Sequence, residues 1–238
     1  MIKKIMMLIA LVMVLLGVPI IAKMLTNLFG LTPTDPNNAF LWLMVRHTIQ
    51  ALIIILLMIF FKKTIKLDFK LGLGNTEIGL NYLKKFMIIF SIGCISLNTI
   101  MLLLDRFQPF EYAYTVKSIV GHLSFQLLFS GPSEEIIFRS FSITIFMHFI
   151  SKKRLKRNVT YANLFALIVF GLAHISITIS PFSMSFLLPQ VITSMVMGYF
   201  YGDCFEKSES VIFPMIMHSL SNVLIVGLSI IFTGILNI

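Results

Sequence analysis

Long apolar runs separated by short polar connections make up most of the sequence. All but the fourth run hold about twenty residues, the length that an α-helix needs to cross the hydrocarbon core of a membrane. The pattern predicts spans at residues 5–25, 39–61, 86–104, 115–150, 160–179, 183–203 and 211–235. We therefore expect an all-α, polytopic membrane helix bundle with about seven transmembrane spans, in which residues 1–238 form a single transmembrane domain.

The fourth run, residues 115–150, is too long for one perpendicular crossing, because a helix of that length would extend about 54 Å. The stretch GPSEE at residues 131–135 interrupts its apolar pattern. Glycine and proline break or kink helices, and a serine can cap a new one. This composition predicts a broken or kinked fourth span, with Ser133 as the cap of its second half.

Two further segments each allow two interpretations. Residues 65–86 mix charges with leucines at helix-like spacing, which fits either an amphipathic helix on the inner membrane surface or an ordinary polar loop. The run at residues 5–22 follows a basic start and lacks a small-residue cleavage pattern. It is therefore interpreted as a retained first span, with a cleaved signal peptide as the alternative.

Composition and charge place the protein in a membrane. The chain is 58% hydrophobic and 12% charged, whereas soluble domains are about a quarter charged. Its formal net charge of +9 is concentrated at the N-terminus and in the second and fourth connections, which predicts that these segments are cytoplasmic. Without a soluble basic domain we expect no nucleic-acid partner, and the basic residues would contact the anionic lipid bilayer. A small chain rich in Lys and Ile suggests a bacterial cell (plasma) membrane.

The sequence EEIIFR places three charged residues inside the fourth apolar run. Glu135 and Arg139 are four positions apart, so they share a helix face and can form an ion pair. Glu134 points about 100° away from Glu135 and remains available for chemistry. Ionisable groups at membrane depth are costly, and their presence indicates a functional site.

Two histidine-containing motifs follow in later spans. His174 comes four residues after Phe170, and His218 comes four residues before Asn222. Each motif alone is more often explained by helix packing than by function. Together with Glu134 they could activate water, with a buried carboxylate as the base and His and Asn as hydrogen-bond donors to an oxyanion. Glu134, His174 and His218 could alternatively bind Zn²⁺.

The order EExxxR, FxxxH, HxxxN, with each motif in a separate span, resembles the CPBP family. These are the CAAX-prenyl-protease and bacteriocin-processing enzymes, also called the Abi family of intramembrane endopeptidases. The residues that carry the resemblance are Glu134, Glu135, Arg139, Phe170, His174, His218 and Asn222. The resemblance covers about residues 117–230, which would form the catalytic core.

The resemblance implies a hydrolase that cleaves a hydrophobic, lipidated or leader-type peptide, or the terminus of another membrane protein. Glu134 and His174 would then activate water, while His218 and Asn222 would form the oxyanion hole. A glutamate-dependent mechanism without a cofactor is favoured over a zinc protease, and the sequence has no HExxH helix. The alternatives are a non-enzymatic scaffold or bacteriocin-immunity protein of the same family, and a small transporter.

Three further histidines match none of these motifs. His47 lies in the second predicted span, and His122 and His148 lie in the fourth. We expect these side chains to have packing or interface roles.

Overall fold

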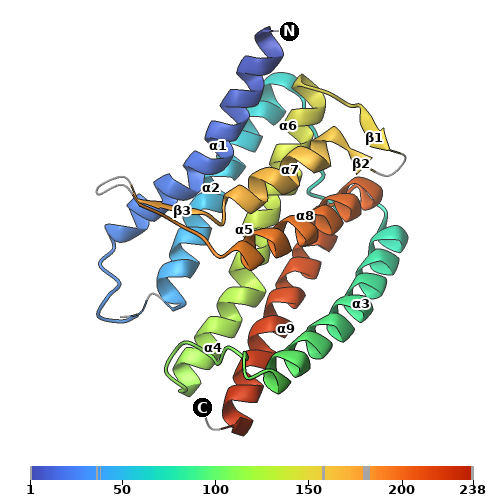
Figure 1. Cartoon of the computed structure of the whole chain (residues 1–238). Coiled ribbons are helices and arrows are strands. Elements are labelled where there is room, and N and C mark those ends of the chain that lie inside the picture. Colours follow the sequence, from blue (N-terminus) through green and yellow to red (C-terminus); the bar gives the residue numbers. More distant parts are fainter. Residues whose placement is uncertain (1, 36, 38, 157–158, 179–182, 237–238) are drawn as a thin grey trace.

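The computed structural model describes residues 2–35, 37, 39–156, 159–178 and 183–236, which form a helix bundle with two short hairpins (Figure 1). The helices outside the fourth apolar run are α1 (Ile2–Asn27), α2 (Leu41–Ile65), α3 (Thr76–Leu103), α7 (Tyr161–Leu172), α8 (Leu188–Ser208) and α9 (Ile212–Leu236). The antiparallel hairpins pair β1 (Arg154–Lys156) with β2 (Val159–Thr160), and β3 (Ser176–Thr178) with β4 (Ser183–Ser185). The mainly helical fold agrees with the predicted class.

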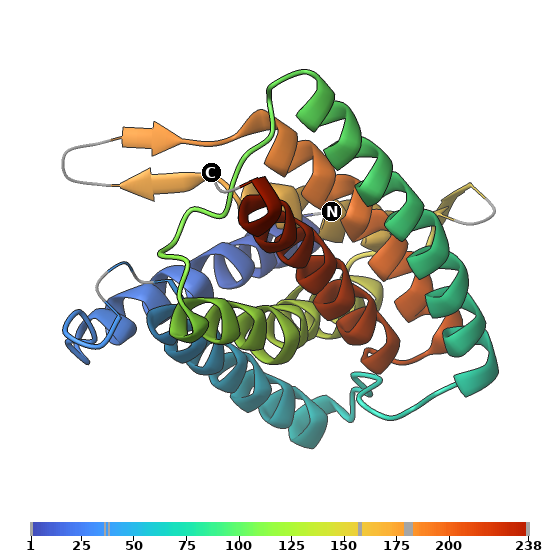
Figure 2. The ribbon, with the colours of Figure 1, turned by 90° about the horizontal axis from the view of Figure 1, so that it is seen from below.

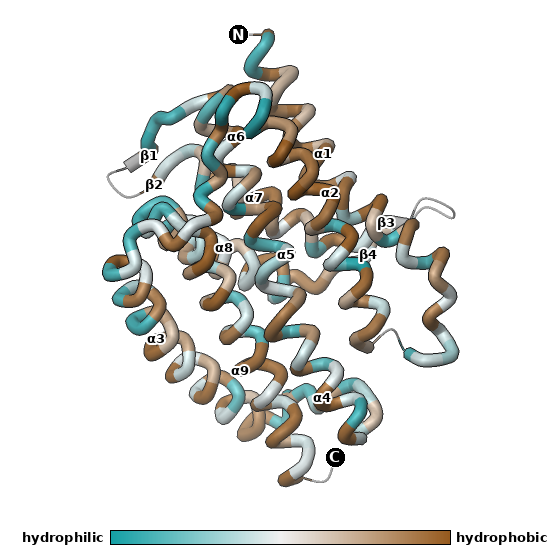
Figure 3. Tube along the Cα trace, turned by 180° about the vertical axis from the view of Figure 1, so that it is seen from behind, coloured by the Kyte–Doolittle hydropathy of each residue, from teal (hydrophilic) through white to brown (hydrophobic). Residues whose placement is uncertain are grey.

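Within the described residues, four helices are long and apolar enough to cross a membrane, namely α1, α2, α3 and α9. Helix α7 is apolar but has only 12 residues, fewer than a perpendicular crossing needs. The fold is therefore that of a membrane helix bundle, whereas the number of seven spans is not confirmed. Figure 3 shows hydrophobic residues along most of α2 and α9, and hydrophilic residues around β1 and the start of α3.

The fourth apolar run is helical without a break. It consists of α4 (Val116–Phe125), η1 (Gln126–Ser130), α5 (Gly131–Glu135), η2 (Ile136–Phe141) and α6 (Ser142–Phe149). The segments η1 and η2 are π-helical turns on either side of α5. A wider turn before Pro132 accommodates a residue that has no N–H to donate. The fourth span is therefore not broken, the expected kink is not confirmed, and Ser133 lies inside the helix and does not cap it.

The connection between α2 and α3 is not helical over residues 66–75, and α3 includes the remainder of the charged, leucine-containing segment. Backbone hydrogen bonds fix this connection to the turn between α8 and α9. Asn75 N donates to Ser208 O at 2.7 Å, and Val211 N donates to Lys70 O at 3.0 Å. The amphipathic-helix interpretation is thus wrong for residues 66–75, which form a tightly bound connection.

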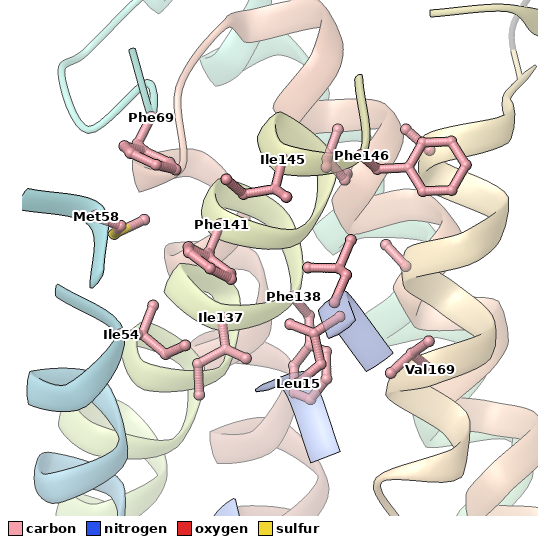
Figure 4. Packing of buried hydrophobic residues seen from close by; sticks show 14 of the residues in the cluster. Leu15, Ile54, Met58, Phe69, Ile137, Phe138, Phe141, Ile145, Phe146 and Val169 are labelled. Atoms are coloured by element: carbon pink, nitrogen blue, oxygen red, sulfur yellow. The ribbon is translucent and has the colours of Figure 1, made fainter. Parts of the chain in front are cut away.

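The apolar core is centred on η2 and α6 (Figure 4). Ile137 and Ile143 are fully buried there, and Leu15 of α1, Ile54 of α2 and Val169 of α7 belong to the same cluster. Lipid tails are as apolar as these side chains, so close packing stabilises the cluster more than water exclusion does. This packing holds η2 and α6, which follow α5 in the chain, against α1, α2 and α7.

Helices α5 and α9 approach each other closely at Gly131. A Cβ atom at this position would lie 2.5 Å from Ser219 Oγ and 2.8 Å from Ser219 N. Residues without bulky side chains let membrane helices come this close. Seen from below, α9 lies near the centre of the bundle, with α4 on one side and α3 and α8 on the other (Figure 2). The close approach brings the acidic end of α5 next to α9.

We expect Gly131→Ala to destabilise the protein by about 1–3 kcal/mol, because the added methyl group has no space against α9. Thermal unfolding in detergent micelles measures the change. Gly17→Ala is the matched control, because a Cβ at Gly17 has no atom within 4 Å. Equal midpoints for the two variants would contradict the close contact.

Candidate active site

Residues of the acidic motif and of the last histidine motif lie together in one cluster of side chains between α5 and α9. Helix α5 supplies Glu134 and Glu135, and α9 supplies His218 and Asn222. Among the described residues, α2 adds His47, which the motifs did not indicate. The cluster therefore draws its polar groups from helices far apart in the sequence.

The ion pair that the spacing suggested is present and fully buried. Arg139 Nε lies 3.1 Å from Glu135 Oε2, and both side chains have 0% exposure. The Arg139 guanidinium also lies over two aromatic rings, 4.5 Å from the centroid of Phe170 and 5.4 Å from that of Tyr201. These cation–π contacts partly replace the hydration that the arginine loses on burial.

His218 connects this ion pair to the second glutamate. Its Nδ1–H donates to Glu135 Oε1 at 2.8 Å, because a carboxylate can only accept. Tyr201 stacks on the His218 ring with centroids 4.9 Å apart. The bond to Glu135 fixes the tautomer, so the neutral ring turns the lone pair of Nε2 toward Glu134 Oε2, 3.7 Å away.

Glu134 lies between two imidazoles. His218 Nε2 is 3.7 Å from its Oε2, and His47 Nδ1 is 3.9 Å from its Oε1. The Glu134 side chain retains 19% exposure, in contrast to the fully buried Glu135. Within the described residues no lysine or arginine lies within ion-pair distance of Glu134, and the groups that face its two carboxylate oxygens are imidazoles.

His47 belongs to a hydrogen-bond network that the sequence interpretation missed. Its Nδ1 lies 2.7 Å from Ser133 Oγ, and the Gln50 amide donates to Nδ1 at 3.1 Å and to Ser133 Oγ at 3.0 Å. The expectation of a packing role for His47 is therefore incomplete. His47 and Gln50 are three residues apart in an apolar helix, and this pair of polar residues was the available signal.

The other two unmatched histidines lie outside this cluster. His122 Nδ1 is 2.8 Å from Ala39 O, and the His148 ring contacts Phe149 with centroids 4.5 Å apart. Both contacts are packing contacts of the expected kind.

His174 lies two residues beyond the end of α7, and not within a helix as expected. The last carbonyls of a helix have no backbone partner, and the His174 Nδ1–H satisfies one of them by donating to Phe170 O at 2.8 Å. The ring therefore directs its other nitrogen away from α7. His174 is close enough to interact electrostatically with Glu134, but it is not within ion-pair distance.

Asn222 is one helical turn beyond His218 on the same face of α9. Its Nδ2 donates to Ser130 Oγ at 3.1 Å, so the carboxamide is oriented from the opposite helix segment, η1. Because this bond uses only one of the two amide hydrogens, the other remains available to a ligand.

The expected alternative of a zinc site was tested on the donor set. Among the described residues, no group of three His, Cys, Asp or Glu side chains is arranged to hold a metal ion. Glu134 and His218 are near each other, but His174 is not within ion-pair distance of Glu134. In this arrangement the three side chains do not form a three-ligand zinc centre.

A groove of about 1290 Å³ lies between α3, α8, α9 and residues 106–112, and its lining includes no residue of the cluster. On α9 it is lined by Ile225, Val226 and Ser229, which follow Asn222 by three, four and seven residues. They therefore share a helix face with Asn222. The rest of the lining is mostly apolar and includes Phe90, Gly93, Thr193 and Phe200.

Comparison with known proteins agrees with the motifs. The family described as "Type II CAAX prenyl endopeptidase Rce1-like" matches residues 116–224. This match confirms the resemblance to the CPBP family and supports a CAAX-type intramembrane protease. The matched range extends from the start of α4 to the middle of α9 and includes all three motifs. No curated protein and no solved structure matches the chain.

We expect the two adjacent glutamates to differ in their effect on stability. Glu135→Gln leaves Arg139 charged and buried without its partner, which should destabilise the protein by about 3–5 kcal/mol. Glu134→Gln removes no direct Lys or Arg ion pair and should change stability far less. Thermal unfolding of both variants in the same detergent tests this difference. Similar losses would show that Glu135 is not the structural member of the pair.

Proposed function

We propose that this protein is an intramembrane endopeptidase that uses a glutamate-activated water to cleave a hydrophobic, lipidated or leader-type peptide. The supporting observation is the position of Glu134, whose two carboxylate oxygens each face an imidazole inside an apolar helix bundle. The family match supports a protease of the CAAX type. A mechanism based on glutamate is favoured because, in the part of the chain that the structure describes, no three His, Cys, Asp or Glu side chains are arranged to hold a metal ion.

In the proposed reaction, Glu134 accepts a proton from water while the water oxygen attacks the peptide carbonyl carbon. His174 orients the water from the end of α7, within electrostatic reach of Glu134. The negative charge moves from the glutamate to the former carbonyl oxygen as the new C–O bond forms. The surrounding apolar helices exclude bulk water, which strengthens each hydrogen bond to this oxyanion.

His218 and Asn222 act as the oxyanion hole. Asn222 donates through its amide, and His218 Nε2 donates once it shares the proton that Glu134 has taken from water. Glu135 holds the other His218 proton on Nδ1 throughout. Collapse of the intermediate breaks the C–N bond, and the shared proton passes to the leaving nitrogen.

The groove between α3, α8 and α9 supports an apolar substrate. It begins on the face of α9 that carries Asn222 and has the size and lining needed to hold a hydrocarbon chain or an apolar peptide segment. We infer that the substrate, a peptide or part of a membrane protein, reaches the site along this groove from the lipid bilayer.

The same proposal places the protein in a bacterial plasma membrane with a cytoplasmic N-terminus. In Figure 1 the N-terminus, β1 and the connection between α2 and α3 lie at one end of the bundle, and the C-terminus lies at the opposite end. The lysine-rich connections thus lie on the side of the N-terminus, as the positive-inside rule requires for this orientation.

Glu134→Gln should abolish proteolysis while the protein still folds. We expect cleavage to fall by at least about 10²-fold, because the variant has no carboxylate to accept the proton from water. The measurement compares the membrane and secreted peptides of cells that carry the native protein or the variant at equal abundance. A peptide end that appears only with Glu134 intact identifies both the activity and the substrate.

His148→Gln is the control for this comparison, because His148 contacts Phe149 outside the cluster. The control variant should produce the same peptide ends as the native protein. Identical peptide pools from the native and Glu134→Gln proteins would contradict proteolysis. They would favour the non-enzymatic scaffold or immunity protein, with Glu134 as a structural residue.

Gly93→Phe should obstruct the groove. A Cβ on Gly93 meets no atom within 4 Å, so the ring can extend into the groove without disturbing α3. We expect the KM for the apolar substrate to rise about tenfold, which corresponds to about 1.4 kcal/mol of lost binding. Gly17→Phe on α1 is the control, because it adds the same ring in open space away from the groove. Unchanged kinetics in Gly93→Phe would show that the substrate does not use the groove.

A further inference from the structure

Helix α2 carries a charged residue that the proposed reaction does not use. Arg46 precedes His47 and lies about one helical turn inside the start of α2. Its Nε is buried and has no hydrogen-bond partner among the described residues. No carboxylate of the described residues lies within 4.0 Å of the Arg46 guanidinium, which is the limit for an ion pair. The guanidinium carbon lies 5.7 Å from the centroid of the Trp42 ring.

Glu134 is the carboxylate whose charge acts on Arg46. The two groups attract each other, although they are too far apart for a direct ion pair. Arg46 also interacts with the neighbouring His47, whose Nδ1 is 3.9 Å from Glu134. The guanidinium of Arg46 therefore belongs to the residue next to His47, a member of the cluster, and its charge acts on Glu134.

The proposed reaction changes the charge balance around Arg46. Before the reaction, anionic Glu134 compensates Arg46, while Glu135 compensates Arg139 in a separate pair. When Glu134 takes a proton from water, the negative charge moves to the former carbonyl oxygen, and Arg46 loses the carboxylate that compensated it. Arginine stays protonated, and an uncompensated cation inside a membrane bundle is unfavourable. A second anion next to Arg46 would stabilise the site at this stage.

We propose that Arg46 binds a carboxylate of the substrate and selects peptides that carry one close to the cleaved bond. A guanidinium binds a carboxylate through two parallel hydrogen bonds, and burial between helices strengthens them. The unpartnered Nε is one of the donors that such a fork needs. This inference rests on the proposed protease function and adds a specificity-determining residue to the same site.

Two parts of a peptide can supply the carboxylate. One is the carboxyl terminus, and the other is an Asp or Glu side chain. The alternative role for Arg46 is contact with lipid headgroups at the membrane surface. In that case the carboxylate of the peptide would have no effect on kcat/KM.

The test uses the full-length protein in detergent micelles and a synthetic peptide that spans the cleavage site found in the Glu134 comparison. The peptide is prepared with a free carboxyl terminus or a terminal amide. Where it contains Asp or Glu, a further form carries Asn or Gln instead. Values of kcat/KM are measured for the native protein, Arg46→Gln, Arg46→Lys and Lys23→Gln. Lys23 is an exposed cation near the end of α1, and its variant is the control.

For the native protein and Lys23→Gln, we expect a kcat/KM at least about tenfold higher for the carboxylate form than for its uncharged counterpart. Arg46→Gln should reduce this ratio to about one by slowing cleavage of the carboxylate form alone. Arg46→Lys should retain part of the preference, because lysine keeps the charge without the planar fork. The form whose neutralisation removes the preference identifies the terminus or the side chain as the source.

Two results would overturn the proposal for Arg46. One is a native protein that cleaves all forms equally, and the other is an equal loss for every form in Arg46→Gln. A result that refutes the protease function is distinguishable from these two results. In that case Glu134→Gln would cleave every peptide as fast as the native protein does. The uncharged peptide also reports folding, since a misfolded variant would cleave neither form.

Discussion

The buried ion pair between Glu135 and Arg139 is the interaction on which the arrangement of the site depends. A single charge left without its partner at this depth costs several kcal/mol, so the pair must remain closed. Phe170 and Tyr201 cover the guanidinium, and His218 binds the remaining carboxylate oxygen. One pair of opposite charges thereby fixes α7, α8 and α9 around the end of α5.

Polar side chains next to this ion pair also form hydrogen bonds between different helices. Asn222 donates to Ser130, and His47 and Gln50 contact Ser133. The two serines are on the same continuous helix but contact different neighbours, α9 and α2. Inside a membrane, water cannot form hydrogen bonds with a polar group that lacks a protein partner. These contacts therefore set the rotation of each helix about its axis.

The sequence predicted the features that local periodicity determines. Glu135 and Arg139 had to share a helix face, and the apolar runs located the helices to within a few residues at most ends. The π-helical turns were not predictable, because Gly131 and Pro132 signal a break equally well. The place of His47 in the cluster was missed because His47 and Glu134 are 87 positions apart in the sequence and lie on different helices. The end of α7 before His174 depends on a side chain that satisfies a free carbonyl, a contact that no periodicity encodes.

The two adjacent glutamates come to have different properties because successive helix residues point about 100° apart. Glu135 faces Arg139, which cannot lose its proton, so its charge is permanently compensated. Glu134 faces His47 and His218 instead. Among the described residues no arginine or lysine forms a direct ion pair with Glu134, and Arg46 acts on it only from beyond ion-pair distance. One turn of helix therefore provides both a permanent structural charge and a carboxylate suited to proton transfer.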